Sequence, residues 1–333
     1  MVRRRVRRTR VATSTRSRRK PGGLAKAATL LPLAIGLAAN VSPSRVNRRP
    51  QAAATAIVGQ ACTLPFDAIK QSHSIDTSCP MAGTASSNAQ ALQNEAKNNF
   101  CAKGPPVNLN LRDFAQLQQA AETAGIPFGG DNSLPEDRDA LHNIASLSNG
   151  RRIGEGTVVR VAAFVMNARN SNTSNGESVN CKHPGIENND IHIVLGENPV
   201  AVGQKPTEAQ ECQSITAEMS PHFRPDTWTR ANLLVNNQKL YRFTGQLFFD
   251  AAHKPCVGTT GPNPKRMAIW EVHPVYAVEV CSDGTSCTVD KDANWVPLDQ
   301  FVGGEPPTTE TRVLPLDRDW MLFRGSAQGR NSP

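Results

Sequence analysis

Residues 190–195 alternate polar and apolar side chains, which predicts a β-strand buried on one face, because successive side chains of a strand point to opposite sides of the sheet. Longer runs rich in β-branched and aromatic residues also predict strands. Five segments after residue 150 fit one of these patterns. They are Thr157–Ala168, Asp190–Leu195, Ser214–Met219, Leu240–Phe249 and Met267–Val280.

The segment between the third and fourth predicted strands has a helical pattern instead. Trp228, Ala231, Leu234 and Val235 fall on one helical face, behind Asp226 as N-cap. The order β-β-β-α-β-β is that of an OB-fold, a five-stranded barrel with a helix between its third and fourth strands. The sequence therefore predicts a mainly β protein with an OB-like barrel over residues 151–302.

Three helices are predicted ahead of the barrel, over Asn88–Phe100, Leu111–Ala124 and Pro135–Ser148. Asn110 is a suitable N-cap for the second helix and Gly125 a suitable end. Ser133 and Glu136 have the spacing of a capping box for the third. These patterns indicate a small helical module, with disulfides, over residues 62–150.

The positive charge is concentrated at the N-terminus. The formal net charge is +8, yet residues 1–66 hold 14 Lys and Arg and no acid, which leaves 37 − 14 = 23 basic against 29 acidic residues in the remainder. The remainder is therefore acidic overall, which argues against nucleic acid as its partner.

A short apolar stretch follows the basic run and ends in small residues near Ala39, as in an export signal. Residues 1–39 are predicted to be a signal peptide, 40–61 a linker and 303–333 a C-terminal extension. We expect an exported protein, periplasmic or secreted, that meets a membrane only through this signal.

Eight cysteines follow the predicted cleavage site, and in an exported protein an even number indicates disulfides. Cys281 and Cys287 flank a hairpin-like turn, which favours a bridge between them. Cys79 with Cys101 is the second predicted pair. The spacing does not choose among the remaining pairings.

The strand alternation also gathers polar side chains that could carry chemistry. In an OB barrel the third strand lies between the second and the fifth, so polar residues of these three strands meet on one outer surface. These residues are Asp190, His192, Glu218, Glu271 and His273. Asp250 and His253, just after the fourth strand, are expected at the rim of the same patch.

Two interpretations of this patch remain open. Imidazoles and carboxylates on adjacent strands can bind a divalent metal such as zinc, manganese or iron, and His192, His273 and Glu271 are the predicted ligands. Alternatively, the groups form a hydrogen-bonded network that docks the helical module onto the barrel. There is no G-x-S-x-G, Walker or G-x-G-x-x-G motif to indicate another chemistry.

Five segments resemble a family of exported bacterial proteins of undetermined function: GTVVRVAAFV, DIHIVL, AEM, FTGQLFFDAAH and WEVHPVYAVEV. Members of that family carry D-x-H-[LI]-V-L, F-[FY]-D-x-x-H and W-E-[IL]-H-P-V segments. The resemblance covers roughly residues 62–281, and Met219 departs from it, since many members have Ile followed by Pro there. It implies export and an OB-like barrel, but no reaction.

Two functional hypotheses follow. The first is an exported binding or structural protein with an undetermined small ligand or protein partner. The second is a metal-dependent hydrolase, such as a phosphodiesterase, that uses the outer-face patch. They differ in solvent access, because a catalytic site must be open to substrate whereas a docking network is covered by residues 62–150.

Overall fold

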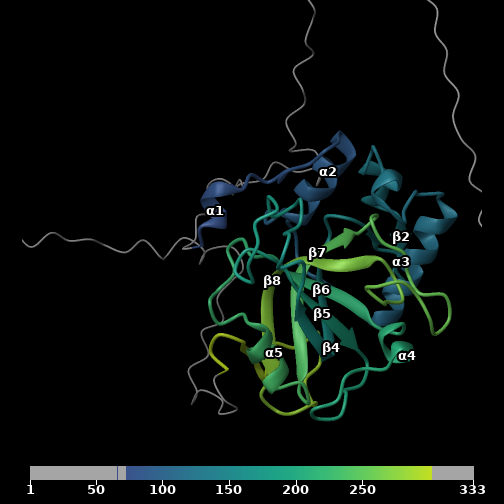
Figure 1. Ribbon diagram of the computed structural model, residues 1–333. Coiled ribbons are helices and arrows are strands. Elements are labelled where there is room, and N and C mark those ends of the chain that lie inside the picture. The colour runs from purple at the N-terminus through teal and green to yellow at the C-terminus, as the bar shows by residue number, and fades with distance from the viewer. Residues whose placement is uncertain (1–65, 67–72, 302–333) are drawn as a thin grey trace, which may run out of the picture. The chain divides into compact units, whose positions relative to one another are not determined.

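The barrel closes because its first strand is long enough to pair on both sides. The computed structural model describes Phe66 and residues 73–301 (Figure 1). Strand β4 (Val158–Asn170) pairs with β7 (Leu240–Phe249) through its first half and with β5 (Ile191–Gly196) through its second half. A register shift after Val165 marks a bulge, which lets one strand bend from one partner toward the other.

The other strands complete the ring in the expected order. Strand β5 pairs with β6 (Ile215–Met219), β6 runs parallel to β8 (Trp270–Cys281), and β8 returns to β7. Helix α5 (Arg230–Val235) lies between β6 and β7 in sequence. The predicted β-β-β-α-β-β order and the OB-like barrel are confirmed.

Short elements extend this sheet. Strand β1 (Val107–Leu109) runs parallel to β4, and β9 (Trp295–Pro297) pairs with β8. A separate two-stranded sheet joins β2 (Ala145–Ser146) to β3 (Arg152–Ile153). A single-turn helix, α4 (Glu208–Glu211), precedes β6.

One hydrophobic core fills the barrel and continues under the preceding helix. Ile193, Ala217 and Val272 point inward from three neighbouring strands and are fully buried, as alternation predicts. Phe114 and Leu117 of helix α3 (Leu111–Thr123) belong to the same core. Residues before and after position 150 are thus packed around shared apolar side chains.

Two of the predicted helices ahead of the barrel are present, close to their expected ends. Helix α2 covers Asn88–Lys97 and is capped by Ser87. Helix α3 begins after Asn110, whose side chain accepts hydrogen bonds from the first turn, including the N–H of Asp113. A short helix, α1 (Ile75–Ser78), precedes them.

The third helix, predicted over Pro135–Ser148, is wrong. The segment contains only a 3₁₀ turn at Asp139–Leu141 and then strand β2. Arg138 is drawn inward, where its guanidinium donates to the carboxylate of Glu155 and to the carbonyl of Phe249. This tertiary contact outweighs the local capping pattern.

The predicted apolar face of the helix before β7 is also wrong. Thr229, not Asp226, caps the six-residue helix α5. Leu233 is its buried residue, whereas Val235 is 70% exposed. One and a half turns are too short for the predicted stripe to decide which side packs on the barrel.

The disulfides confirm one predicted pair and correct the other. Cys281 and Cys287 are bonded across their turn, and a further bridge joins Cys212 to Cys256. Cys79 is bonded to Cys181, not to Cys101, which is itself in a disulfide. The Cys79–Cys181 bridge connects the segment of α1 and α2 to the loop between β4 and β5.

The predicted signal peptide, the linker and the C-terminal extension lie outside the described residues. Within residues 73–301, no helix has the length and apolar character needed to cross a membrane.

Candidate functional site

The barrel brings the predicted polar residues together on one face, on strands β5, β6 and β8. His192 lies directly opposite Glu218 in the antiparallel pair, and Glu271 lies next to Thr216 in the parallel pair. With His273 two positions further along β8, the polar side chains share one side of the sheet, because side chains at i and i+2 point the same way.

Glu218 is at the centre of this group. One of its carboxylate oxygens, Oε1, lies 3.2 Å from Nδ1 of His192. The other, Oε2, lies 2.9 Å from Nδ1 of His273 and 4.0 Å from Nζ of Lys97. Lys97 comes from helix α2, so a cation from outside the barrel reaches the middle of the patch.

Asp250 and His253 join the patch at its rim, as expected. Arg266, which is fully buried, donates to Asp250 over 2.7 Å and also to Glu271. His253 approaches Asp250 through Nδ1 at 2.5 Å and keeps 36% of its side chain exposed. Asp250 is thus the link between the exposed rim and the buried interior of the patch.

We call this group the charged cluster. Its members on the barrel and adjoining loops, together with the lysine of α2, are Lys97, Glu177, Asp190, His192, Glu218, Asp250, His253, Arg266, Glu271 and His273.

The cluster is buried. Asp190, Glu218, Glu271 and His273 are each at most 1% exposed, and His192 is 9% exposed. Charged side chains are seldom buried to this extent unless they are paired. Among the described residues, these side chains therefore have little or no surface open to a substrate.

Helices α1 and α2 lie along one side of the barrel (Figure 1). We call residues 73–101, which contain them, the N-terminal cover, and Lys97 of this cover contacts the cluster. The amide of Asn99 donates to Gln246 of β7 at 2.5 Å, and Gln246 donates to the carbonyl of Ala96 at 2.7 Å. The hydroxyl of Tyr276 donates to the carbonyl of Asn99 at 2.6 Å.

The first part of the cover is also attached to the rest of the fold by buried hydrogen bonds. The carboxylate of Asp76 lies 3.2 Å from Nδ1 of His222 and accepts the N–H of Phe223, and the side chains of Asp76 and His222 are fully buried. His73 contacts the carbonyl of Arg224. The cover is therefore anchored at both ends on the barrel.

The asparagine-rich loop between β4 and β5 buries the other side. Glu177 of this loop lies 3.6 Å from Nε2 of His192, and Asn180 donates to Asp190 at 3.3 Å. The disulfide at Cys181 joins this loop to the cover, as does the contact between Ser178 and Asn94. Loop and cover form one connected layer over the patch.

The electrostatic environment keeps two carboxylates ionised. Burial raises the pKa of Glu218, but the charges of His192, Lys97 and His273 outweigh it and hold that pKa below its usual range. Burial likewise raises the pKa of Asp250, and Lys97, His253 and Arg266 reverse this and hold it well below the ordinary value.

Burial and neighbouring charges also shift the pKa of three other cluster members. Burial lowers the pKa of His192, but Glu218 and Glu177 outweigh it, so the pKa is raised. Burial lowers the pKa of Lys97 as well, and the carboxylates of Asp250 and Glu218 raise it above its usual value. Asp190 differs, because burial, reinforced by Glu177, raises its carboxyl pKa.

Several buried nitrogen and oxygen atoms of the cluster have no hydrogen-bond partner. They include both ring nitrogens of His273, Oε2 of Glu218 and Oδ2 of Asp190. One potential ligand atom from each of Asp190, Glu218 and His273 lies within 4.8 Å of the others, and Glu177, Asp190 and His192 form a second such group. The predicted set of His192, His273 and Glu271 is not among the groups that the described residues form.

Lys97, Glu177 and Arg266 are cluster members that the sequence patterns did not identify. None of them lies on a barrel strand, so strand alternation carries no information about them. A lysine at the end of a helix is expected to be exposed to solvent, because lysine side chains are almost never fully buried.

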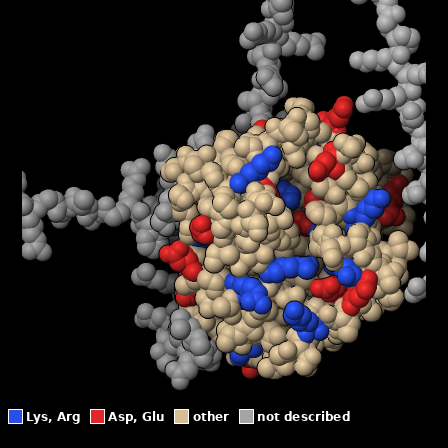
Figure 2. All heavy atoms as spheres, in the orientation of Figure 1, with Lys and Arg blue, Asp and Glu red and all other residues tan. Residues whose placement is uncertain are grey.

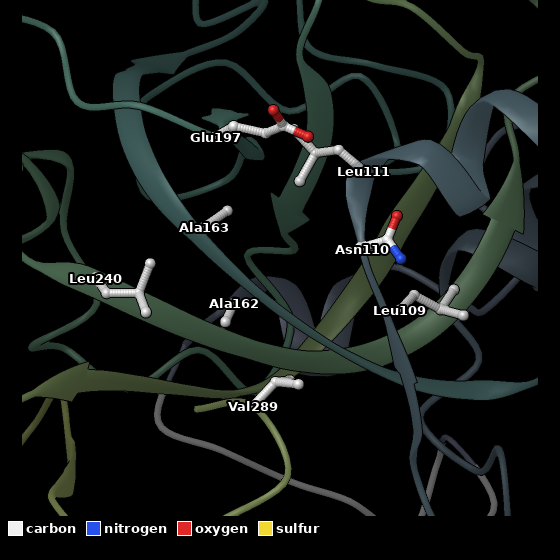
Figure 3. A pocket seen from close by; sticks show the side chains of 8 residues that line it. All are labelled: Leu109, Asn110, Leu111, Ala162, Ala163, Glu197, Leu240 and Val289. Carbon is white, nitrogen blue, oxygen red and sulfur yellow. The ribbon is translucent and has the colours of Figure 1, made fainter. Parts of the chain in front are cut away.

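A shallow apolar hollow of about 260 Å³ lies elsewhere on the barrel (Figure 3). Side chains from β1, β4 and β7 line it, among them Leu109, Ala162 and Leu240, with Glu197 at its edge. The cluster contributes no residue to it.

The surface carries both signs of charge. On the face shown in Figure 2, Lys and Arg alternate with Asp and Glu over the described residues, without a continuous basic area. Comparison of the chain with protein-family models, with curated proteins and with solved structures gives no match.

Proposed function

We propose that this chain is an exported, disulfide-stabilised binding or structural protein without catalytic activity, whose charged cluster docks the N-terminal cover onto an OB-like barrel. The observation that carries the proposal is the burial of Glu218 between two strand histidines and Lys97 of the cover.

The covered face is the one that OB-folds commonly use for ligands. Their binding surface is formed by the second and third strands and by the loop after the first strand. Here these are β5, β6 and the loop that carries Cys181. The cover is disulfide-bonded to that loop, and its Lys97 lies 4.0 Å from Glu218 of β6. An external ligand would therefore bind to another surface or displace the cover.

Burial weighs against the hydrolase alternative. Hydrolysis needs a water and a scissile bond within reach of the catalytic groups. Glu218 and His273 are each 1% exposed as side chains, and the disulfide holds the loop and cover together over them. These properties suit a network that fastens two parts of a chain.

An assay of hydrolysis tests the absence of catalysis. The purified mature chain is incubated with a phosphodiester and with a carboxylic ester, in Zn²⁺ or Mn²⁺ and in chelator. We expect no turnover above the buffer rate in any condition. Turnover that Glu218→Gln abolishes, and that the exposed-site control Glu136→Gln retains, would establish the hydrolase instead.

Export has its own test. Three disulfides among the described residues support an oxidising compartment. We expect N-terminal sequencing of the mature protein to begin close to residue 40, and the denatured, unreduced protein to show almost no free thiol. Recovery of a reduced chain that still begins with its arginine run would contradict export.

A further inference from the structure

The charged cluster contains more carboxylates than side chains of fixed positive charge. Its five carboxylates belong to Glu177, Asp190, Glu218, Asp250 and Glu271. Two cationic side chains of fixed charge, Lys97 and Arg266, face them, and Arg266 is engaged by Asp250 and Glu271 alone. Arg266 does not reach Asp190 or Glu218, and Lys97 approaches Glu218 only to 4.0 Å.

Arg224 adds a third fixed positive charge near Asp190, but it donates no hydrogen bond to that carboxylate. Its charge acts on Asp190, but its guanidinium donates to backbone carbonyls, including those of Asn189, Met219 and Ile186. The carboxylate of Asp190 receives one side-chain donor, Asn180, on Oδ1, and Oδ2 has no hydrogen-bond partner.

His273 supplies an independent indication. Its side chain is 1% exposed and neither ring nitrogen makes a hydrogen bond, although a buried imidazole ordinarily donates from one nitrogen and accepts at the other. Nδ1 lies 2.9 Å from Oε2 of Glu218 without the geometry of a hydrogen bond. A metal ion bound by both atoms would satisfy the nitrogen and the carboxylate oxygen together.

The distances fit a cation. Two donors bound to one metal ion at about 2.1 Å lie about 3.0 Å apart in octahedral and about 3.4 Å apart in tetrahedral geometry. The potential ligand atoms of Asp190, Glu218 and His273 all lie within 4.8 Å of one another, so the side chains must draw closer for one ion to contact all three.

We propose that Asp190, Glu218 and His273 bind one divalent transition-metal cation, of the zinc or manganese type, which ties β5, β6 and β8 together beneath the N-terminal cover. One imidazole and two carboxylates are ligands that these ions accept, whereas calcium and magnesium prefer oxygen ligands alone. Water or a further carboxylate oxygen completes the coordination.

The cation is structural, because its ligands are covered. The cation site is a proposal beyond the docking role and does not depend on that role, because Lys97 could fasten the cover with or without a metal ion. The metal ion would add positive charge next to Asp190 and Glu218, which Arg266 does not reach.

The test measures metal content of the full mature chain after equilibration with Zn²⁺ or Mn²⁺ and removal of free metal. We expect about one equivalent per chain, and a melting midpoint that falls when a chelator removes it. Glu218→Gln keeps the side-chain volume and should weaken binding by at least about tenfold. His273→Ala should do the same, while the control His142→Ala, at a histidine that is not a member of the cluster, should bind as the wild type does.

The outcomes separate the two proposals. A wild-type chain that retains neither metal, and whose melting midpoint ignores the chelator, overturns the cation site and leaves the docking role intact. The cation site is also overturned if folded Glu218→Gln retains a full equivalent of metal. The same holds if the metal is lost in His192→Ala but not in His273→Ala. Should the histidine variants not fold, the ligand-field spectrum of Co²⁺ in the wild-type chain decides whether imidazole and carboxylate coordinate the ion. Metal-dependent turnover, in contrast, supports the site and contradicts the non-catalytic function.

Discussion

The ammonium of Lys97 lies 4.0 Å from the carboxylate of Glu218, although one residue belongs to helix α2 and the other to strand β6 of the barrel. Lys97 also lies over the ring of Phe248, with its nitrogen 5.7 Å from the ring centre. A buried ion pair does not by itself add much net stability, because desolvation of both groups offsets their attraction. What it does fix is the position of α2, since any displacement leaves charges buried without a partner.

Replacement of Lys97 by methionine tests this relationship. The side-chain volume is nearly kept, but Glu218 and Asp250 lose a neighbouring cation, so the free energy of unfolding should fall by ~3–5 kcal/mol. Denaturant titration measures the change. Lys205→Met, at an exposed position, should stay within about 0.5 kcal/mol of the wild type. Equal effects of the two changes would show that Lys97 is solvated in solution.

The disulfides give a second prediction, based on the length of chain that each one closes. Cys79 and Cys181 are 102 residues apart, whereas Cys281 and Cys287 are 6 apart. From the loop-closure entropy of the unfolded chain, removal of the first bridge should cost about 4.7 kcal/mol and removal of the second about 2.4 kcal/mol. Paired Cys→Ser variants, compared by denaturant unfolding, provide the measurement, and the reverse ranking would contradict the role of the long bridge in fastening the cover.

The sequence predicted the barrel strands and the meeting of His192 with Glu218 because a strand has a period of two, and the order of strands in an OB barrel then sets which faces adjoin. It could not predict that the patch is covered. Lys97 and Glu177 approach it from a helix end and a loop, where no periodicity relates a side chain to a distant strand. The pairing of Cys79 with Cys181 depends on the same long-range approach, which is why the nearer Cys101 was the wrong partner.

The pH dependence of stability should depend on Asp250. Its pKa is held well below the usual value, chiefly by Lys97 and His253 acting against burial, so the ionised form is favoured by folding. The contribution is therefore fully present above the unfolded-state pKa of about 3.9 and is lost as the pH falls toward the lowered native value. The difference in unfolding free energy between wild type and Asp250→Asn should be largest near pH 6 and should shrink steadily below pH 4.

Asp131, which is exposed, provides the matched control for that series. The difference between wild type and Asp131→Asn should be small. A wild-type minus Asp250→Asn difference that stays constant from pH 6 to pH 2 would mean that Asp250 is not ionised preferentially in the native protein.

Gln246 is the amide that holds the end of the cover against the barrel, and its replacement tests whether the cover behaves as a fixed part of the fold. It accepts the amide of Asn99 and donates to the carbonyls of Ala96 and His273 at 2.7 and 3.0 Å, with no exposed surface. Gln246→Leu leaves these groups buried without partners, which should cost ~1–3 kcal/mol. Because the lost bonds are at the end of α2, hydrogen exchange should accelerate in residues 88–99 more than in the barrel strands. Gln238→Leu removes a side-chain bond of the same kind, to the carbonyl of Val200 at 2.6 Å, at a place away from the cover. That control should leave exchange in residues 88–99 unchanged, and an equal acceleration in both variants would indicate global loosening, with no particular role for Gln246 in fastening the cover.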